Sequence, residues 1–331
     1  MHEGILLVCS MRGLIVTDNL ELDRGGLVPS GKRELSAVRP DLFRRGLELV
    51  DNLEKAARAI IFPKDRSAGK LFVTYTVDSS VPHKCTEFFC EAQGSVSVSA
   101  GNYLSLDIRD EHPSDFSSLV ALKPGDLDSL CISNGHVADQ ELTCLRGLTK
   151  LRELCLFHCW KITDAGLLHL QGLNGLQSVL IEGSTIGDSG LAHLQVLPDL
   201  WDLHLTNTQV TSAGLSILPN FPALRNCSLW YTDLIGDAGL AHLGRLTKLE
   251  QLSLTGTKIS DAGLSHLRKM TGLQVLRLSE TGISDAGLEH LRDLKNLKRL
   301  DLSATSVTDT GLSRIKAYLP DCEIVKWEMP G

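Results

Sequence analysis

The stretch KISDAGLSHL, residues 258–267, recurs in close copies from residue 161 almost to the end of the chain. The glycines of successive copies lie 24 or 25 residues apart. These glycines are Gly166, Gly190, Gly214, Gly239, Gly263, Gly287 and Gly311. A fixed period in this range is typical of solenoids, in which each repeat is one structural unit stacked on its neighbours. The decapeptide therefore decides the fold of the larger part of the chain.

A short strand-like segment with the pattern L-x-x-L-x-L precedes the copies, as in LEQLSL (249–254). Because alternate residues of a strand point to opposite sides, Leu154 and Leu156 are expected to enter a core. Equivalent strands then stack in parallel about 4.8 Å apart, and neighbouring coils complete a core that one coil cannot form alone. The spacing of Leu167, Leu170 and Leu173 predicts a short helix packed against that core.

Weaker copies extend the array in both directions. LDSLCI at Leu127 and YLSLDI at Tyr103 continue the pattern toward the N-terminus, and CEIVKW (322–327) reads as a final strand without a helix. We therefore predict eight or more parallel strands between about residues 103 and 327, in a repeat domain that spans residues 101–331. This domain would contain about eight to nine repeats and a C-terminal capping strand.

The full template, L-x-x-L-x-L-x-x-T-x-I-x-D-A-G-L-x-x-L-x-x-L, resembles the leucine-rich-repeat proteins. Residues CWKITDAGL (159–167) resemble most the cysteine-containing class, in which Cys stands where other classes carry Asn. The resemblance implies an α/β fold, a right-handed horseshoe with a parallel sheet on its concave side and helices on its convex side. It also implies that another protein binds the concave sheet. The Thr-rich style is similar to repeats common in bacterial proteins. Thr replaces Cys in later copies, at Thr208, Thr232, Thr257, Thr281 and Thr305.

The acidic position of the decapeptide is interpreted as a structural device. Asp, or once Ser, precedes the glycine by two residues, and these residue types favour the N-cap of a helix. The glycine one turn later would let helix and sheet approach closely, and the Thr position would hydrogen-bond the backbone of the next coil. The predicted N-caps are Asp164, Asp188, Ser212, Asp237, Asp261, Asp285 and Asp309.

Three groups of metal-ligating residue types are present, and none predicts a metal site. The histidine column of the decapeptide would lie on helices about 8–10 Å apart, too far for rings that share a zinc held at about 2 Å. His83, Cys85 and Cys90 match no standard zinc spacing, and a fourth ligand is missing. Cys144, Cys155, His158 and Cys159 include a repeat-defining cysteine. The column consists of His169, His193, His242, His266 and His290.

Residues 1–100 contain no repeat, and we expect them to form an α+β region that caps the first coil. Residues 39–62 carry apolar side chains at helical spacing and end before Pro63, which predicts a helix. LFVTYTV (71–77) and SVSVS (95–99) alternate at period two, which predicts strands. ILLVCS (5–10) and LIVT (14–17) are shorter candidate strands.

The composition of the chain limits which binding partners and which cellular compartment we expect. The net charge of −7 disfavours nucleic acid and anionic membranes, which both attract positive surfaces. No stretch reaches 18 apolar residues, and the N-terminus lacks the pattern of a signal peptide. Nine cysteines without a regular framework favour reduced thiols in a cytoplasm. P-loop, G-x-S-x-G and H-E-x-x-H motifs are absent, so we predict no catalytic residue and no cofactor.

Scarce aromatic residues gather at outward-facing positions of a few coils, where other coils carry Ser, Thr, Gly or Ala. Buried aromatics with polar neighbours are the usual composition of an interface hot spot. The alternative is that Trp160 and Trp230 pack on their own solenoid. Arg277, Glu280 and Arg299 belong to a charged surface that we expect to be solvated. The predicted partner-binding residues are Phe157, His158, Trp160, Glu182, Trp201, His204, Asn207, Trp230 and Tyr231.

The function expected from these features is that of a monomeric, non-enzymatic scaffold that binds another protein. Two alternatives stay open at this point. In the first, the solenoid targets an effector or enzymatic domain formed by residues 1–100. In the second, suggested by the cysteine-containing class, the repeats select substrates as an adaptor of a ubiquitin-ligase-like complex. The lack of a recognisable adaptor-binding module weakens the second alternative.

Overall fold

The computed structural model describes residues 8–10, 13–15, 58–62, 64, 67–78, 81–98, 102–109, 116–133 and 135–327. The chain forms two compact units, Met1–Ala59 with Ser97–Gly101, and Ile60–Val96 with Asn102–Gly331. In the first unit, β1 (Val8–Ser10) and β2 (Gly13–Ile15) pair antiparallel. β1 lies within the candidate strand at residues 5–10, and β2 overlaps the candidate strand at residues 14–17 only at residues 14–15.

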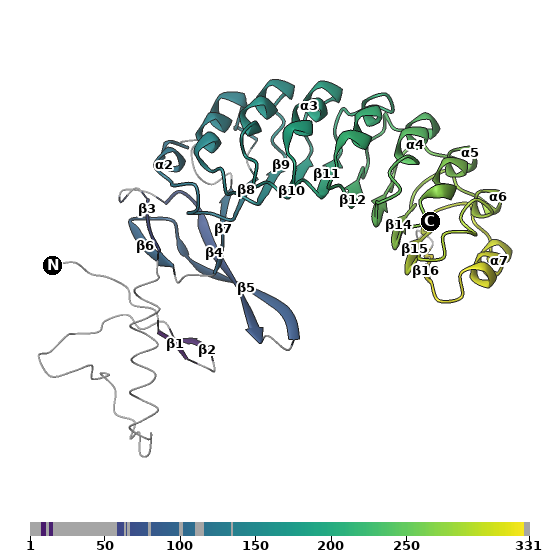
Figure 1. Ribbon diagram of the computed structural model, residues 1–331, viewed down its shortest axis with the longest axis horizontal. Coiled ribbons are helices and arrows are strands. Elements are labelled where there is room, and N and C mark those ends of the chain that lie inside the picture. Colours follow the sequence, from purple (N-terminus) through teal and green to yellow (C-terminus); the bar gives the residue numbers. More distant parts are fainter. Residues whose placement is uncertain are drawn as a thin grey trace, which may run out of the picture. The chain divides into compact units, whose positions relative to one another are not determined.

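The second unit contains a sheet in which ten strands, β7 to β16, lie parallel and in chain order (Figure 1). Equivalent residues of successive coils are paired, as in Leu154, Val179 and Leu203. The prediction of eight or more parallel strands is confirmed. The strands are β7 (Tyr103–Arg109), β8 (Ser129–Ser133), β9 (Glu153–Phe157), β10 (Ser178–Glu182), β11 (Asp202–Thr206), β12 (Asn226–Ser228), β13 (Gln251–Ser253), β14 (Val275–Arg277), β15 (Arg299–Asp301) and β16 (Glu323–Val325).

Helices cover the outer side of this sheet, and the core lies between the two layers (Figure 1). Leu252 and Leu254 from the strand side and Leu264 and Leu267 from the helix side have no exposed surface. The predicted arrangement of a concave sheet and convex helices is thus confirmed. The helices are α2 (Ser117–Val120), α3 (Asp188–His193), α4 (Asp237–Leu243), α5 (Asp261–Leu264), α6 (Asp285–Leu288) and α7 (Asp309–Tyr318), with 3-10 helices η1 (Asp139–Gly147), η2 (Asp164–Leu170), η3 (Leu194–Val196), η4 (Gly214–Asn220) and η5 (Ser265–Lys269).

An antiparallel hairpin continues the sheet beyond its first parallel strand. β4 (Lys70–Asp78) pairs with β7 on one side and with β5 (Val81–Glu91) on the other, both antiparallel. An exposed sheet edge is a template for unwanted pairing, so the hairpin protects the start of the array. The strand predicted at residues 71–77 is confirmed.

A second strand pair corrects one prediction. β3 (Arg58–Ile61) pairs with β6 (Ser95–Val98), and the N–H of Phe62 donates to Gly94 O at 2.7 Å. The strand predicted at residues 95–99 is confirmed, whereas the helix predicted over residues 39–62 is wrong for Arg58–Ile61. Ile60 is fully buried in the strand, so tertiary pairing overrides the helical spacing. Residues 39–57 of that predicted helix lie outside the described residues.

The aspartate of the decapeptide links each coil to the next one. Asp261 Oδ1 accepts the backbone N–H of Ser284 at 2.8 Å, and its Oδ2 accepts the Ser284 hydroxyl at 2.6 Å. This interaction satisfies a backbone donor at the start of the next helix, which has no intrahelical partner. The same pair of hydrogen bonds recurs along the array in Asp139–Thr163, Asp188–Thr211, Asp237–Ser260 and Asp285–Thr308.

The predicted N-cap assignment is therefore wrong by one residue. The helix cap is the residue before the aspartate, as at Ser260, whose hydroxyl accepts the N–H of Ala262. Ser284 caps the next helix in the same way. Asp261 is then the first helical residue, and its carboxylate is free to reach the following coil. The same correction applies to the other predicted caps that begin a helix, Asp164, Asp188, Asp237, Asp285 and Asp309.

The glycine that follows the aspartate by two residues lies close to the aspartate of the preceding coil. A Cβ added to Gly287 would lie 2.3 Å from Asp261 Oδ1, and one added to Gly263 would lie 2.3 Å from Asp237 Oδ1. A Cβ at this position would displace the carboxylate of the preceding coil, so glycine leaves space for the carboxylate and its hydrogen bonds. The expectation that this glycine serves helix–sheet approach is thus replaced by an inter-coil contact.

We expect Asp261→Ala and Gly287→Ala to be coupled rather than additive. Each single change should lower the free energy of unfolding by about 1–3 kcal/mol, because each disturbs the hydrogen bonds between Asp261 and Ser284. In the Asp261→Ala background the carboxylate that Gly287 avoids is gone, and alanine has the higher helix propensity. Urea denaturation of the four proteins should show that the double variant is more stable than the sum of the single losses predicts. Strict additivity would mean that the two residues do not share a contact.

The Thr and Cys position forms hydrogen bonds that differ in part from the expected ones. The hydroxyls of Thr257, Thr281 and Thr305 donate to a carbonyl three residues earlier in their own coil, at 2.5–2.6 Å. Thr232 instead donates to Leu205 O of the preceding coil at 2.8 Å. The expected link to the next coil is therefore wrong at these positions, because three of the hydroxyls bond within their own turn and the hydroxyl of Thr232 bonds to the preceding coil.

Candidate protein-binding face

Three columns of side chains point away from the helices on the concave face of strands β9–β14. The parallel register places equivalent residues side by side, so each column crosses the strands. The middle column consists of Cys155, Leu180, His204, Ser228, Ser253 and Arg277. The column at the start of the strands includes Ser178, Asp202, Asn226 and Gln251, and the column at their end includes Phe157, Glu182, Thr206 and Trp230.

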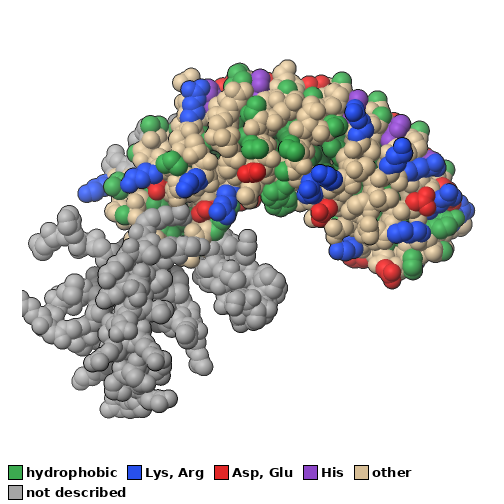
Figure 2. All heavy atoms as spheres, viewed as in Figure 1, with side chains coloured by type: hydrophobic (Ala, Val, Ile, Leu, Met, Phe, Trp, Pro, Cys, Tyr) green, Lys and Arg blue, Asp and Glu red, His purple; other side chains and the backbone are tan. Residues whose placement is uncertain are grey.

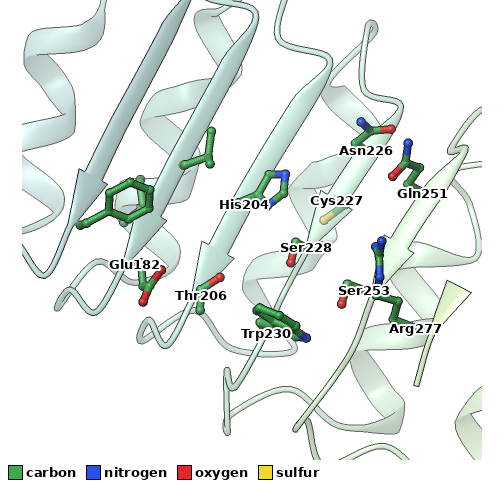
Figure 3. A pocket seen from close by; sticks show the side chains of 13 residues that line it. Glu182, His204, Thr206, Asn226, Cys227, Ser228, Trp230, Gln251, Ser253 and Arg277 are labelled. Atoms are coloured by element: carbon green, nitrogen blue, oxygen red, sulfur yellow. The ribbon is translucent and has the colours of Figure 1, made fainter. Parts of the chain in front are cut away.

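A hollow of about 320 Å³ opens on this face (Figure 3). It has an aromatic and apolar part, which includes Trp230, and a polar part, which extends to Arg277 on β14. The structure therefore brings together four of the predicted residues, Phe157, Glu182, His204 and Trp230. The complete lining is Phe157, Leu180, Ile181, Glu182, His204, Thr206, Asn226, Cys227, Ser228, Trp230, Gln251, Ser253 and Arg277.

His204 is held in place by Asp202 of its own strand. The two are joined by a hydrogen bond between His204 Nε2 and Asp202 Oδ1, at 3.0 Å. The other carboxylate oxygen of Asp202 accepts the Ser178 hydroxyl at 2.8 Å. Burial alone would raise the pKa of Asp202, but the hydrogen bonds from His204, Ser178 and Asn226 bring this pKa below its ordinary value. Asp202 is thus a fixed anion that orients the imidazole at the hollow.

The residue after each strand has a left-handed backbone conformation. His158, Asn207 and Tyr231 have φ angles of 54°, 49° and 49°, and Gly183 and Gly256 occupy the equivalent position in other coils. Such angles are uncommon for residues with a side chain. Only the tertiary structure shows that three predicted site residues occupy this turn.

Tyr231 lies along the edge of the sheet and spans two coils. Its ring covers Gly256, where an added Cβ would lie 2.4 Å from Tyr231 Cδ1. Its hydroxyl donates to Glu280 Oε1 at 2.8 Å. The ring centroid lies 6.2 Å from that of Trp230, with an interplanar angle of 39°. Trp230 and Tyr231 are nevertheless 43% and 47% exposed, so they form an ordered aromatic pair that faces solvent.

We expect the Tyr231 phenol to titrate above its ordinary pKa of 10.0, because the hydrogen bond to Glu280 favours the protonated form. A raised folded-state pKa contributes stability below pH 10.0, which is lost as the pH rises through the folded-state pKa. Absorbance titration at the wavelength of tyrosinate, with Tyr231→Phe as the reference, isolates this group. Glu280→Ala should bring the pKa back toward its ordinary value. An unchanged titration in Glu280→Ala would contradict the hydrogen bond.

The other predicted residues lie outside the hollow. Trp160 packs its ring against the backbone of the preceding coil, where a Cβ on Gly135 would overlap the ring, yet its side chain is 54% exposed. Trp201 lies at the start of its strand, and its carbonyl accepts the N–H groups of Arg225 and Asn226. Asn207 lies in the left-handed turn. His158 Nε2 lies 3.8 Å from Glu182 Oε1, at the rim.

Several lining residues were not among the predicted ones. Asn226, Ser228, Gln251 and Ser253 occupy outward strand positions, but they are neither aromatic nor at the strand ends where the aromatic residues gather. Arg277 was assigned to a solvated charged surface, but it lines the hollow. The strand alternation that placed the core leucines contains the signal for all of them, because it also identifies the outward positions.

In the part of the chain that the structure describes, the other candidate sites show no gathered ligands. Within the described residues, no three His, Cys, Asp or Glu side chains are placed to hold a metal ion. Cys155 is paired in register with Cys131, and the side chains of His83 and Cys85 lie outside the described part. No helix in the described ranges has both the length and the apolar character to cross a bilayer. Histidines follow the helical side of the repeats (Figure 2), where Arg268 donates to His290 Nδ1 at 3.0 Å.

The repeats of this chain also match a known family of repeats. A family model described as Leucine Rich repeat matches residues 147–170, 245–267 and 293–316. Among solved structures, internalin C2 from Listeria monocytogenes matches with 22% identity and a TM-score of 0.44, over 59% of this chain and 77% of that one. The internalin inlF from the same organism matches with 20% identity and a TM-score of 0.39, over 68% of this chain and 78% of its own. A search of curated proteins gives no match.

Proposed function

We propose that this leucine-rich-repeat solenoid is a non-enzymatic scaffold that binds another protein on the concave face of strands β9–β14. The aromatic pair of Trp230 and Tyr231 carries the proposal, because it is ordered and about half exposed beside the hollow. Large aromatic side chains exposed together on a folded surface typically mark an interaction site. Neither side chain is needed to fill the leucine core, since both point away from it.

The surroundings of the pair favour tight binding. Tyr231 is held by Gly256 beneath its ring and by Glu280 at its hydroxyl, so little conformational entropy would be lost when a partner covers it. His204 is likewise held by Asp202. Polar groups around a central aromatic side chain are the usual composition of a hot spot. We propose that Phe157, Glu182 and His204 contact the partner together with this pair.

The remaining predicted residues belong to the margin of the proposed interface. Trp160 and Trp201 are exposed at opposite edges of the sheet, and His158 and Asn207 lie in the turns that follow the strands. Rim residues usually contribute less binding energy than the centre does. We therefore propose that these four residues set the outline of the interface and that Trp230 occupies its centre.

Site-specific photo-crosslinking tests the location of the interface. A photoreactive amino acid at Thr206, in the hollow, should capture a partner from a lysate of the source cell when the full chain is used. The matched control carries the same group at Lys269, which is exposed on the convex helix η5. Capture from position 269 with the same yield, or capture only there, would contradict a concave interface.

We further propose that the scaffold acts as a monomer in the cytoplasm of a bacterial cell, without nucleic-acid or membrane partners. The net charge of −7 supports the proposed lack of nucleic-acid and membrane partners, because an acidic protein repels both kinds of anionic surface.

Cys159, whose Sγ donates to Ile132 O at 3.6 Å, occupies the position that defines the cysteine-containing repeat class. Its role there supports assignment of at least this coil to that class.

A further inference from the structure

We infer that the hollow binds a partner segment that carries a carboxylate next to an apolar or aromatic side chain. This inference rests on the proposed function and specifies the chemistry of the partner. Arg277 would bind the carboxylate, and Trp230 would pack against the apolar side chain. Both residues line the same hollow (Figure 3).

Arg277 is a cation placed to receive an anion. It is the one Lys or Arg side chain among the residues that line the hollow. Within the described part of the chain, no carboxylate oxygen lies within 4.0 Å of its guanidinium, whereas Arg299 on the next strand pairs with Glu323 at 3.1 Å. A guanidinium offers five N–H donors in a planar arrangement that suits a carboxylate. Arg277 therefore has unused donors that face the hollow.

Ser253 supplies an independent observation at the same place. Its residue is 5% exposed, and its Oγ is buried without a hydrogen-bond partner among the described residues. Ser253 is the register partner of Arg277 on the adjacent strand, and both line the hollow. A buried hydroxyl without a partner is costly, and an acceptor atom of a bound ligand can satisfy it. A carboxylate that accepts from Arg277 could accept from this hydroxyl as well.

The distances across the strands fit a short extended segment. Trp230 and Arg277 belong to coils two strand spacings apart, which is about 10 Å. An extended chain advances about 3.3 Å per residue, so the two contacts are about three residues apart on the partner. Glu182 lies on the other side of Trp230, about two further spacings away. Its negative charge disfavours a carboxylate at that end, so the segment would bind in one orientation.

Affinity selection from synthetic peptides tests the inference with the full-length protein. Two libraries of random hexapeptides are used, one with a C-terminal amide and one with a free C-terminal carboxylate. Peptides retained by the protein are identified by mass spectrometry, and their affinities are measured by calorimetry. We expect enrichment of Asp or Glu within three residues of Trp, Phe, Tyr or Leu in the amide library. Enrichment confined to the second library would instead identify a chain terminus as the carboxylate.

Variants then separate the inference from the proposed function. Arg277→Gln should weaken the selected peptides at least tenfold, Arg277→Glu should select Lys or Arg in place of Asp or Glu, and the control Arg299→Gln should change little. The denaturation midpoints of all variants should match that of the parent, which excludes misfolding. Peptides that depend on Trp230 but show no preference for a carboxylate and no response to Arg277 would overturn the inference and leave the proposed function standing. Selected peptides that depend on neither residue would overturn both.

Discussion

Replacement of Leu254 by alanine is expected to lower the free energy of unfolding by about 2–5 kcal/mol. Leu254 has 0% of its surface exposed and lies inside the array, just after β13, with further coils on both sides. Truncation removes buried methyl and methylene groups and leaves a cavity, because the neighbouring coils hold the surrounding leucines in place. Each repeat of a solenoid contacts only its neighbours, so the damage should be local.

Urea denaturation measures this loss, and Leu168→Ala is the matched control. Leu168 is a leucine of η2 that is 41% exposed, so its truncation should cost less than about 1 kcal/mol. Amide hydrogen exchange should show that protection is lost first in β12–β14. Equal losses for the two variants, or a uniform loss of protection along the array, would mean that the core is wrongly placed or that the repeats unfold as one unit.

The second large effect is expected in binding. Trp230→Ala should weaken the complex with the captured partner by at least about 2 kcal/mol, or about 30-fold in the dissociation constant. The side chain is 43% exposed in the free protein, and it belongs to the aromatic and apolar part of the hollow. Its removal should take away the central apolar contact while the leucine core stays intact, so the stability of the fold should change little.

Calorimetry or surface plasmon resonance with purified partner gives the affinity, and Arg299→Ala is the control. Arg299 lies on the neighbouring part of the same sheet but forms an ion pair with Glu323 and does not line the hollow. Its truncation should change the affinity less than threefold, roughly 0.6 kcal/mol. If Trp230→Ala binds as tightly as the parent protein, Trp230 serves only its own solenoid.

The amino-acid sequence by itself determined the architecture of the repeats. The return of KISDAGL-like segments every 24 or 25 residues is sufficient to place strand, turn and helix, because equivalent residues of a stacked array must occupy equivalent positions. The alternation in LEQLSL separates Leu252 and Leu254, which enter the core, from Ser253, which faces outward. The same reasoning recovered the terminal strands at Tyr103 and Glu323, although their copies of the motif are incomplete.

Other features were decided by contacts between segments that are distant in the sequence. Asp261 has the right chemistry for an N-cap, but its carboxylate reaches Ser284 of the next coil, and Gly287 leaves space for it. Arg58–Ile61 has helical spacing, but pairing with Ser95–Val98 makes it a strand. Local propensities amount to fractions of a kcal/mol per residue, so a buried ladder or inter-coil hydrogen bond overrides them.

Some residues of the candidate site are likewise identified by the sequence, and others only by the tertiary structure. The sequence identified Trp230, Phe157, Glu182 and His204, because scarce or polar residues at outward positions are visible in the repeat pattern. The sequence did not identify Arg277, because a charged residue on a strand is expected to be solvated unless its neighbours in space are known. Periodicity states which residues are equivalent to one another, but not which side chains meet. Whether a charge has a partner and whether a hydroxyl is buried depend on the spacing and curvature of the stacked coils, and only the tertiary structure contains these.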